Sequence, residues 1–289
     1  MNAASRLNLQ AGFVSVAILL LLLAIWHFAT LPAGGAAAAG LTSEQIEYQK
    51  MLGKDPTKEA KANSGFPTLA QMRETVVRNL ASPFYDNGPN DKGIGIQLGH
   101  SLLRVALGFG IAALVAIPLG FVIGMSPLMY RALDPFIQVL KPISPLAWMP
   151  LALYTIKDSS ISGIFVIFIC SVWPMLLNTA FGVAGVRREW LNVAKTLEVS
   201  PMRKAFEVIL PAAAPTIVTG MRISMGIAWL VIVAAEMLVG GTGIGYFVWN
   251  EWNNLSLTNV IFAILVIGIV GMALDLMFAR LQKAISYVE

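Results

Sequence analysis

The sequence predicts an all-α polytopic membrane protein with six transmembrane helices. Hydrophobic residues make up 57% of the 289 residues and charged residues only 12%, and the mean hydropathy is +0.72. Soluble domains carry roughly 25% charged residues, so most of this chain is embedded in lipid. The apolar residues gather in six runs, each near the roughly 20 residues that a helix needs to cross a hydrocarbon core about 30 Å thick.

In chain order, the six predicted spans are residues 12–31, 101–124, 136–156, 163–183, 217–238 and 259–279. The first could be mistaken for a secretory signal, because Arg6 precedes it and small residues follow it. Its apolar core is longer than the ~7 to 15 residues of a signal peptide, which favours a retained helix. The third span is interrupted by Lys141, Pro142, Pro145 and Pro150. Such a broken helix is tolerated only where the freed backbone groups face protein or a water-filled cavity.

Basic residues set the predicted orientation, since cytoplasmic loops of membrane proteins are enriched in lysine and arginine. With a cytoplasmic N-terminus, the short external loops hold only Lys157. The cytoplasmic side then holds nine of the 20 basic residues, namely Arg6, Arg131, Arg187, Arg188, Lys195, Arg203, Lys204, Arg280 and Lys283. Both termini are therefore expected in the cytoplasm.

This orientation divides the chain into three parts. Residues 1–31 form the cytoplasmic N-terminus and the first span, 32–100 an external loop, and 101–289 a five-helix core that carries a cytoplasmic loop at 184–214. The external loop is either a solvated spacer or a docking surface for an external partner. Thr42 or Ser43 could cap a short helix that ends near Leu52. After Pro67, apolar residues at helical spacing predict an amphipathic helix lying on the membrane surface.

Several classes of chemistry have no candidate residues. Cys170 is the only cysteine, and His27 and His100 are the only histidines, so neither a disulfide framework nor a zinc site is expected. No nucleophilic arrangement or carboxylate pair can be assembled, and the modest basicity indicates membrane orientation and not nucleic-acid binding. No phosphate-binding G-x-x-x-x-G-K-[ST] loop occurs, so any ATP must be bound by another polypeptide. We expect no enzyme activity and no metal or cofactor on this chain.

Two charges lie in the fifth span. Arg222 and Glu236 are 14 residues apart, a rotation only about 40° short of four turns, so they share a helix face at a separation of about 21 Å. Met225 and Trp229 lie between them on this stripe. The stripe either lines a translocation pathway, or Arg222 reaches the cytoplasmic interface and Glu236 borders the outer loop. In the sixth span, Asp275 is expected to form a structural ion pair or an interfacial anchor.

The charged segment 187–211, RREWLNVAKTLEVSPMRKAFEVILP, is predicted to form two water-facing helices between membrane spans. Residues 187–199 form the first helix, and Ser200 with Pro201 begins the second as an N-cap followed by proline. Trp190, Val193 and Leu197 are apolar residues at helical spacing that could seat in a groove of another protein.

Here the chain resembles the permeases of binding-protein-dependent type I ABC importers. Their loop carries the motif E-A-A-x-x-x-G, followed by nine residues and I-x-L-P, and this motif docks onto the ATPase. The matching residues predict a coupling site made of Asn192, Val193, Ala194, Leu197, Glu198, Ser200, Pro201, Leu210 and Pro211. Asn192 replaces the acid, and Glu198 replaces the glycine. Without that glycine, the turn is expected around Ser200 and Pro201 instead.

The resemblance extends from Phe66 to the end of the chain. Segments such as WPMLLNTAFGV, NVAKTL and AAEMLVGGTGIGYFVWN are most similar to the nitrate transporter permeases within the nitrate/bicarbonate/cyanate and sulfonate/taurine group. It implies a homodimer in the bacterial inner membrane, two cytoplasmic ATPase subunits that bind ATP and magnesium, and a periplasmic solute-binding protein. The implied activity is import of a small oxyanion, most of all nitrate, with bicarbonate, cyanate or taurine-like sulfonates as rivals. An ATP-independent channel or carrier and a ligand-binding membrane sensor are alternatives from other classes.

Overall fold

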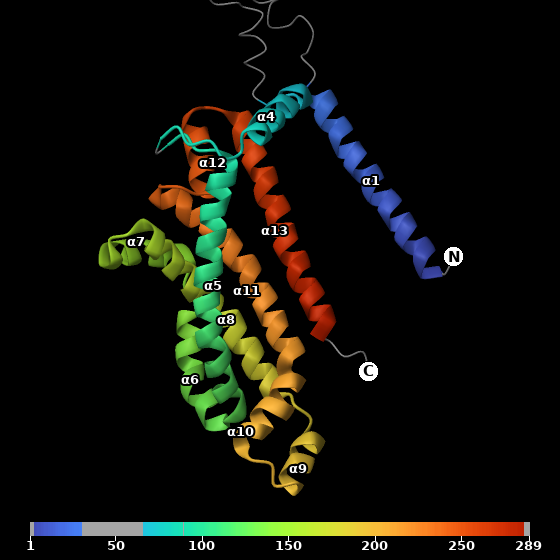
Figure 1. Ribbon diagram of the computed structural model, residues 1–289, viewed down its shortest axis with the longest axis vertical. Coiled ribbons are helices and arrows are strands. Elements are labelled where there is room, and N and C mark those ends of the chain that lie inside the picture. Colours follow the sequence, from blue (N-terminus) through green and yellow to red (C-terminus); the bar gives the residue numbers. More distant parts are fainter. Residues whose placement is uncertain (1–2, 31–65, 89, 286–289) are drawn as a thin grey trace, which may run out of the picture. The chain divides into compact units, whose positions relative to one another are not determined.

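A computed structural model describes residues 3–30, 66–88 and 90–285, and these are helical with no strand among them (Figure 1). The all-α prediction is confirmed. The helix expected from Thr42 or Ser43 to Leu52 lies outside the described residues. The helices are α1 (Ala3–Ala29), α4 (Leu69–Ala81), α5 (Ile94–Met125), α6 (Pro127–Leu140), α7 (Pro145–Ile156), α8 (Ser159–Ala184), α9 (Arg188–Thr196), α10 (Pro201–Lys204), the π-helix η1 (Ala205–Ile209), α11 (Leu210–Val239), α12 (Ile244–Asn253) and α13 (Leu257–Ile285).

Five of these described helices are long and apolar enough to cross a membrane, and α6 with α7 forms a bent pair that adds a sixth. Each predicted span corresponds to one of these elements. The helices extend further than the apolar runs: α5 begins at Ile94, and the fifth span continues into the helices that precede Leu210. Helix length follows from the continuous backbone hydrogen bonds, which a hydropathy pattern does not show.

The predicted break in the third span is present. The axes of α6 and α7 differ by 88°, with residues 141–144 between them. Ser144 has an extended backbone and Pro145 occupies the start of α7, as expected because a residue that precedes proline avoids the helical region. In Figure 1, α6 runs beside α5 and α7 turns away from it.

The described chain forms two compact units. Residues 1–81 and 256–262 make up the first unit, and 82–255 and 263–289 the second. In the first unit, the indole Nε1 of Trp26 donates to the carbonyl oxygen of Pro67 at 2.9 Å, and Trp26 packs edge-to-face on Phe66. The predicted amphipathic helix is α4, whose Asn79 Nδ2 donates to Asn259 Oδ1 at 3.1 Å.

In the second unit, α8 packs between α5 and α11. Small residues allow the backbones to approach closely: a methyl group on Gly108 would come within 2.7 Å of Ile167, and one on Gly120 within 2.6 Å of the Leu176 carbonyl oxygen. Such packing drives helix association in lipid, where water exclusion between helices is absent. This three-helix core fixes the position of the two regions described next.

Candidate functional site

The water-facing loop between α8 and α11 is anchored at both of its ends. Val186 and Ile209 are buried together with Val183, Ala213 and Ile217 in one apolar cluster. The cluster joins the last turn of α8, the start of the loop, η1 and the first turns of α11. A displacement of the loop therefore moves the ends of α8 and α11 with it.

The predicted coupling residues do not all face outward. Val193 of α9 and Leu197, the C-cap of this helix, are 59% and 71% exposed, and Asn192 is exposed as well. Ala194, in contrast, is 4% exposed and packs inside the loop. Trp190, 44% exposed, extends the same outer face and has the Arg187 guanidinium over its ring. The outward residues left for the predicted docking face of this helix are therefore Trp190, Asn192, Val193 and Leu197.

The turn after α9 corrects one expectation. Glu198 itself adopts φ 51°, so the left-handed residue lies where the family motif has glycine and not around Ser200 and Pro201. The amide of Glu198 donates to the carbonyl oxygen of Lys195 at 3.1 Å, and the amide of Val199 donates to the carbonyl oxygen of Ala194 at 3.0 Å. This pair of bonds is a Schellman motif, which satisfies the last carbonyl groups of the helix strongly enough to hold a non-glycine residue in this conformation.

Ser200 and Pro201 have the other role that the sequence predicted for them. The Ser200 hydroxyl accepts from the amide of Arg203 as the N-cap of α10, and Pro201 occupies the first turn. The chain then continues through η1 into α11 without a break. Leu210 is half-buried and Pro211 is exposed at the start of α11.

A second region is an apolar groove between α11 and α13, with a volume of about 350 Å³. Met225 and Trp229 line it from α11 and Gly271 from α13. The indole Nε1 of Trp229 donates to the carbonyl oxygen of Ile267 at 3.0 Å, which fixes the ring against α13. Three of the four predicted stripe residues, Arg222, Met225 and Trp229, lie on this groove.

Arg222 is compensated by an acid on the neighbouring helix. Its Nε and Nη2 atoms each donate to an oxygen of Asp275 at 2.7 Å, and its Nη1 donates to Gln282 at 3.4 Å. The ion pair expected for Asp275 is thus present, with Arg222 as its partner. Both side chains are partly exposed, at 37% and 52%, and such planar two-bond geometry is the preferred pairing of arginine with a carboxylate.

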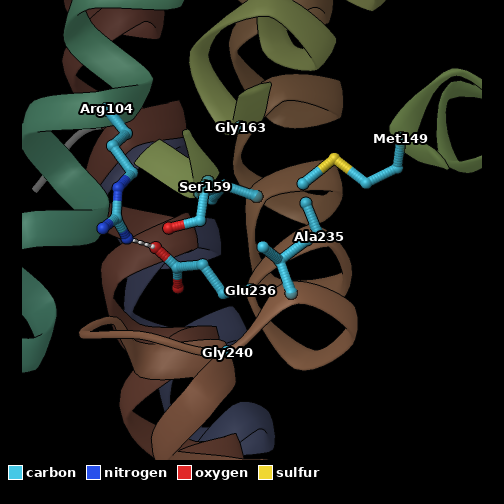
Figure 2. A pocket seen from close by; sticks show the side chains of 9 residues that line it. Arg104, Met149, Ser159, Gly163, Ala235, Glu236 and Gly240 are labelled. Atoms are coloured by element: carbon cyan, nitrogen blue, oxygen red, sulfur yellow. Dashed lines mark hydrogen bonds and ion pairs between the residues drawn. The ribbon is translucent and has the colours of Figure 1, made fainter. Parts of the chain in front are cut away.

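Glu236 does not line the groove. It is buried beside α5, where Arg104 Nη1 donates to Glu236 Oε1 at 2.7 Å (Figure 2). Ser101 Oγ donates to Glu236 Oε2 at 2.8 Å, and the amide of Gly245 donates to the same oxygen at 3.0 Å. Arg104 also donates to the carbonyl oxygen of Thr242 at 2.6 Å. The ion pair therefore ties α5 to the C-terminal end of α11 and to the turn before α12.

Sequence reasoning missed Arg104, Ser101 and Gln97, whose side chain accepts from the amide of Gly243 at 2.6 Å. A usable signal was present, because Arg104 and Glu236 are opposite charges that each interrupt an apolar run, and such charges pair with one another. The cavity beside them in Figure 2 holds only about 10 Å³. That is room for at most one water molecule, so no larger solute fits beside this ion pair in the structure.

Long apolar helices joined by an anchored, water-facing helical loop define a polytopic membrane protein of the transporter type. Residues 116–287 match the family described as "Binding-protein-dependent transport system inner membrane component". This match covers more than half of the chain, which therefore belongs to that family. The predicted family is confirmed, and the chain is a permease component of such a transport system.

Curated relatives confirm the predicted group within the family. The chain is 46% identical over 226 residues to the nitrate import permease protein NrtB of Synechocystis sp., covering 78% of this chain and 82% of the relative. It is 45% identical over 208 residues to the bicarbonate transport system permease protein CmpB of the same organism, covering 72% and 74%. The taurine transport system permease protein TauC of Escherichia coli is 32% identical over 220 residues, covering 76% and 80%.

Solved structures confirm the fold. The chain is similar to the inward-facing MetNI methionine ABC transporter, with a TM-score of 0.58 and 14% identity, over 65% of this chain and 94% of that one. The type I ABC permease architecture predicted from the sequence is thereby confirmed. Sequence identity at this level supports the fold alone.

Proposed function

We propose that this chain is the permease subunit of an ATP-driven importer of a small oxyanion, with nitrate as the first candidate. The assignment of nitrate as the substrate rests on the 46% identity to a nitrate import permease. The bicarbonate permease follows at 45%, so bicarbonate is the second candidate. A taurine-like sulfonate is less well supported, at 32%, and cyanate rests on the group resemblance.

The proposed assembly is a homodimer of this chain with two cytoplasmic ATPases and a periplasmic solute-binding protein. The ATPases supply the ATP and magnesium sites, because no phosphate-binding loop occurs in the 289 residues. The exposed apolar face of α9 supports ATPase docking, since apolar side chains that project from a water-facing helix suit a groove in a partner. An ATP-independent channel or carrier has no use for such a face.

Coupling follows from the way the loop is anchored. A partner that grips Val193 and Leu197 would displace α9, and the cluster around Val186 and Ile209 transmits that displacement to α11. Because η1 runs directly into α11, the helix that carries Arg222, Met225 and Trp229 moves as a consequence. We infer that this motion alternates access to the pathway, with Trp229 acting as a gate against α13.

The pathway proposal is narrowed by the placement of the charges. Arg222 lies on the groove but is paired with Asp275, so a passing anion would have to compete with a carboxylate for it. This competition from Asp275 keeps the binding of the anion to Arg222 weak. Weak binding is required for conduction, because the ion must also leave the site. Glu236 has a different role: its hydrogen bonds from Ser101 and Gly245 hold the turn before α12.

Orientation belongs to the proposal as well. The excess of arginine and lysine in the α9–α10 loop supports a cytoplasmic position for it, with both termini on that side of the inner membrane. Single cysteines in a Cys170→Ser background test this orientation. A probe that does not cross membranes should label position 256 from outside and position 200 only after permeabilisation. Labelling of position 200 in intact cells would overturn the orientation.

The function is tested with the complete complex in vesicles. The ATPases and the solute-binding protein that co-purify with this chain are reconstituted with it, and uptake of isotope-labelled nitrate, bicarbonate and taurine is compared with and without ATP. We expect ATP-dependent nitrate uptake that needs the binding protein. Equal uptake without ATP would support the channel or carrier alternative, and no uptake of any solute would favour a sensor.

A further inference from the structure

Three basic residues lie in the middle of apolar segments of the second unit, and only one of them lacks an acidic partner. Arg104 donates to Glu236 at 2.7 Å, and Arg222 donates to Asp275 at 2.7 Å. Lys141, between α6 and α7, is exposed and forms no ion pair or side-chain hydrogen bond with any residue in the described ranges. Among these three, Lys141 alone presents a full positive charge that no carboxylate neutralises.

From the chain topology, we expect Lys141 to lie within the thickness of the hydrocarbon core. α6 begins at Pro127, two residues after α5 ends at Met125, so it enters the bilayer from the surface where α5 leaves it. Its 14 residues extend about 21 Å at 1.5 Å per residue, which is roughly two thirds of a 30 Å hydrocarbon core. Lys141 directly follows the last residue of α6, so it lies at the 88° bend between α6 and α7. Figure 1 shows α7 turning away at this corner.

The structural contacts of Lys141 do not neutralise its charge. Lys141 ends α6, and its backbone amide donates to Ile137 at 2.9 Å. A cation at a helix C-terminus is favourable, but this interaction is weak and confined to the last turn. The acid nearest in the sequence, Asp134, is seven residues earlier and accepts from Gln138 at 2.6 Å. Charges at this depth usually face a water-filled cavity or mark an ion pathway.

The start of α7 adds potential of the same sign. The helix has 12 residues, and the Ser144 hydroxyl at its N-cap accepts no bond from the first turn. The backbone amides that begin a helix carry partial positive charge, and interrupted membrane helices direct such ends toward anionic solutes. The amides reinforce the attraction that the Lys141 ammonium exerts on an anion.

We propose that Lys141, at the corner between α6 and α7, is a binding residue for the small oxyanion as it crosses the permease. This inference rests on the proposed oxyanion import. A lysine ammonium suits the task because it is a compact charge with rotatable donors and no fixed two-bond geometry. It attracts nitrate without clamping it, so the ion can leave again.

The test removes the positive charge at position 141 by mutation and then restores it by chemical modification. Lys141→Cys is made in a Cys170→Ser background, and the complete complex with its ATPases and binding protein is reconstituted in vesicles. We expect nitrate uptake to fall about tenfold relative to the Cys170→Ser parent, as for loss of one charge-assisted hydrogen bond. Modification with aminoethyl methanethiosulfonate, which replaces the ammonium, should recover most of the uptake. The sulfonatoethyl reagent, which adds a negative charge, should not.

Two controls separate charge from folding. Arg131→Cys removes an exposed charge in the second turn of the same helix and should leave uptake within about twofold of the parent, because a solvated charge interacts weakly. Lys141→Arg keeps the charge and should retain uptake. Co-purification of the ATPases shows that each variant assembles.

The outcomes distinguish this proposal from the proposed function. Parental uptake in Lys141→Cys, while the parent imports nitrate, overturns the role of Lys141 and leaves nitrate import standing. A parent that imports no oxyanion overturns the proposed function. In that case, labelling still tests whether position 141 faces water. If position 141 in the assembled complex resists both water-soluble reagents, it lies in lipid or protein, and the proposal for Lys141 is overturned.

Discussion

The Nη1 atom of Arg104 lies 2.7 Å from the Oε1 atom of Glu236, and the two side chains are only 10% and 4% exposed. The carboxylate is further bonded by Ser101 and Gly245, and the guanidinium by Thr242. A buried ion pair repays its desolvation only when its remaining donors and acceptors are satisfied. Here they are, so the pair holds α5, α11 and the turn before α12 together.

Breaking this pair from one side should destabilise the subunit strongly. We expect Glu236→Gln to cost about 3–5 kcal/mol, because Arg104 is left buried without a counter-charge. The double variant Arg104→Met/Glu236→Gln should cost less. Thermal unfolding in detergent measures both, with Arg203→Gln as control, since Arg203 and Glu207 form a pair that is 66% and 58% exposed. An unchanged unfolding temperature for Glu236→Gln would contradict the structural role.

The left-handed backbone at Glu198 predicts a stabilising change. Glu198→Gly should stabilise the loop by about 1 kcal/mol, because the left-handed conformation costs a non-glycine residue roughly 1–2 kcal/mol and glycine little. Hydrogen exchange of the amides of Glu198 and Val199 should slow. Glu189→Gly, in the first turn of α9, is the matched control and should have the opposite sign. Faster exchange in Glu198→Gly would mean that the carboxylate itself holds the turn.

The docking face predicts which substitutions block coupling without unfolding the loop. Leu197→Asp and Asn192→Trp should abolish ATPase co-purification and uptake, because they place a charge or bulk on an exposed face. Leu255→Asp, at a residue that is 90% exposed and far along the chain, is the control. Ala194→Arg should lower loop stability as well, since Ala194 is buried. Normal assembly in both docking variants would remove α9 from the interface.

The Arg222–Asp275 pair predicts a non-additive double variant. Arg222→Gln alone should cut uptake, because it leaves Asp275 uncompensated in an apolar groove and repels the anion. Adding Asp275→Asn should restore part of the loss, since the groove is again neutral, and the difference measures the coupling of the two side chains. Uptake is measured over a range of nitrate concentrations. Wild-type uptake in Arg222→Gln would show that Arg222 is an interfacial anchor outside the pathway.

The spans and the break between α6 and α7 were predictable from the sequence because they follow from local rules. In lipid, a chain must satisfy its backbone hydrogen bonds internally, as a helix does. A run of about 20 apolar residues therefore predicts a membrane-spanning helix. Proline lacks a backbone N–H donor and restricts the backbone of the residue before it, so Pro142 and Pro145 predict the break. The loop could be identified because its apolar residues recur at helical spacing within a charged segment.

The partners of the charges could not be predicted in this way. Arg222 and Glu236 share a face of α11 by helical geometry, yet Arg222 meets Asp275 on α13 and Glu236 meets Arg104 on α5. Rotation about one helix axis gives the direction of a side chain but not which neighbouring helix lies there. Likewise, Glu198 adopts φ 51° because the Schellman bonds outweigh its own preference, a balance that residue type alone does not reveal.

Composition, apolar length and proline placement therefore determined by themselves that this chain is a six-span helical membrane protein with a broken third span and a water-facing loop. Only the tertiary structure decided that Arg104 and Arg222 are paired with acids while Lys141, in the described part of the chain, is not. The physical reason is that hydropathy and helical period act within one segment, whereas the compensation of a charge in lipid depends on groups brought to it by other segments.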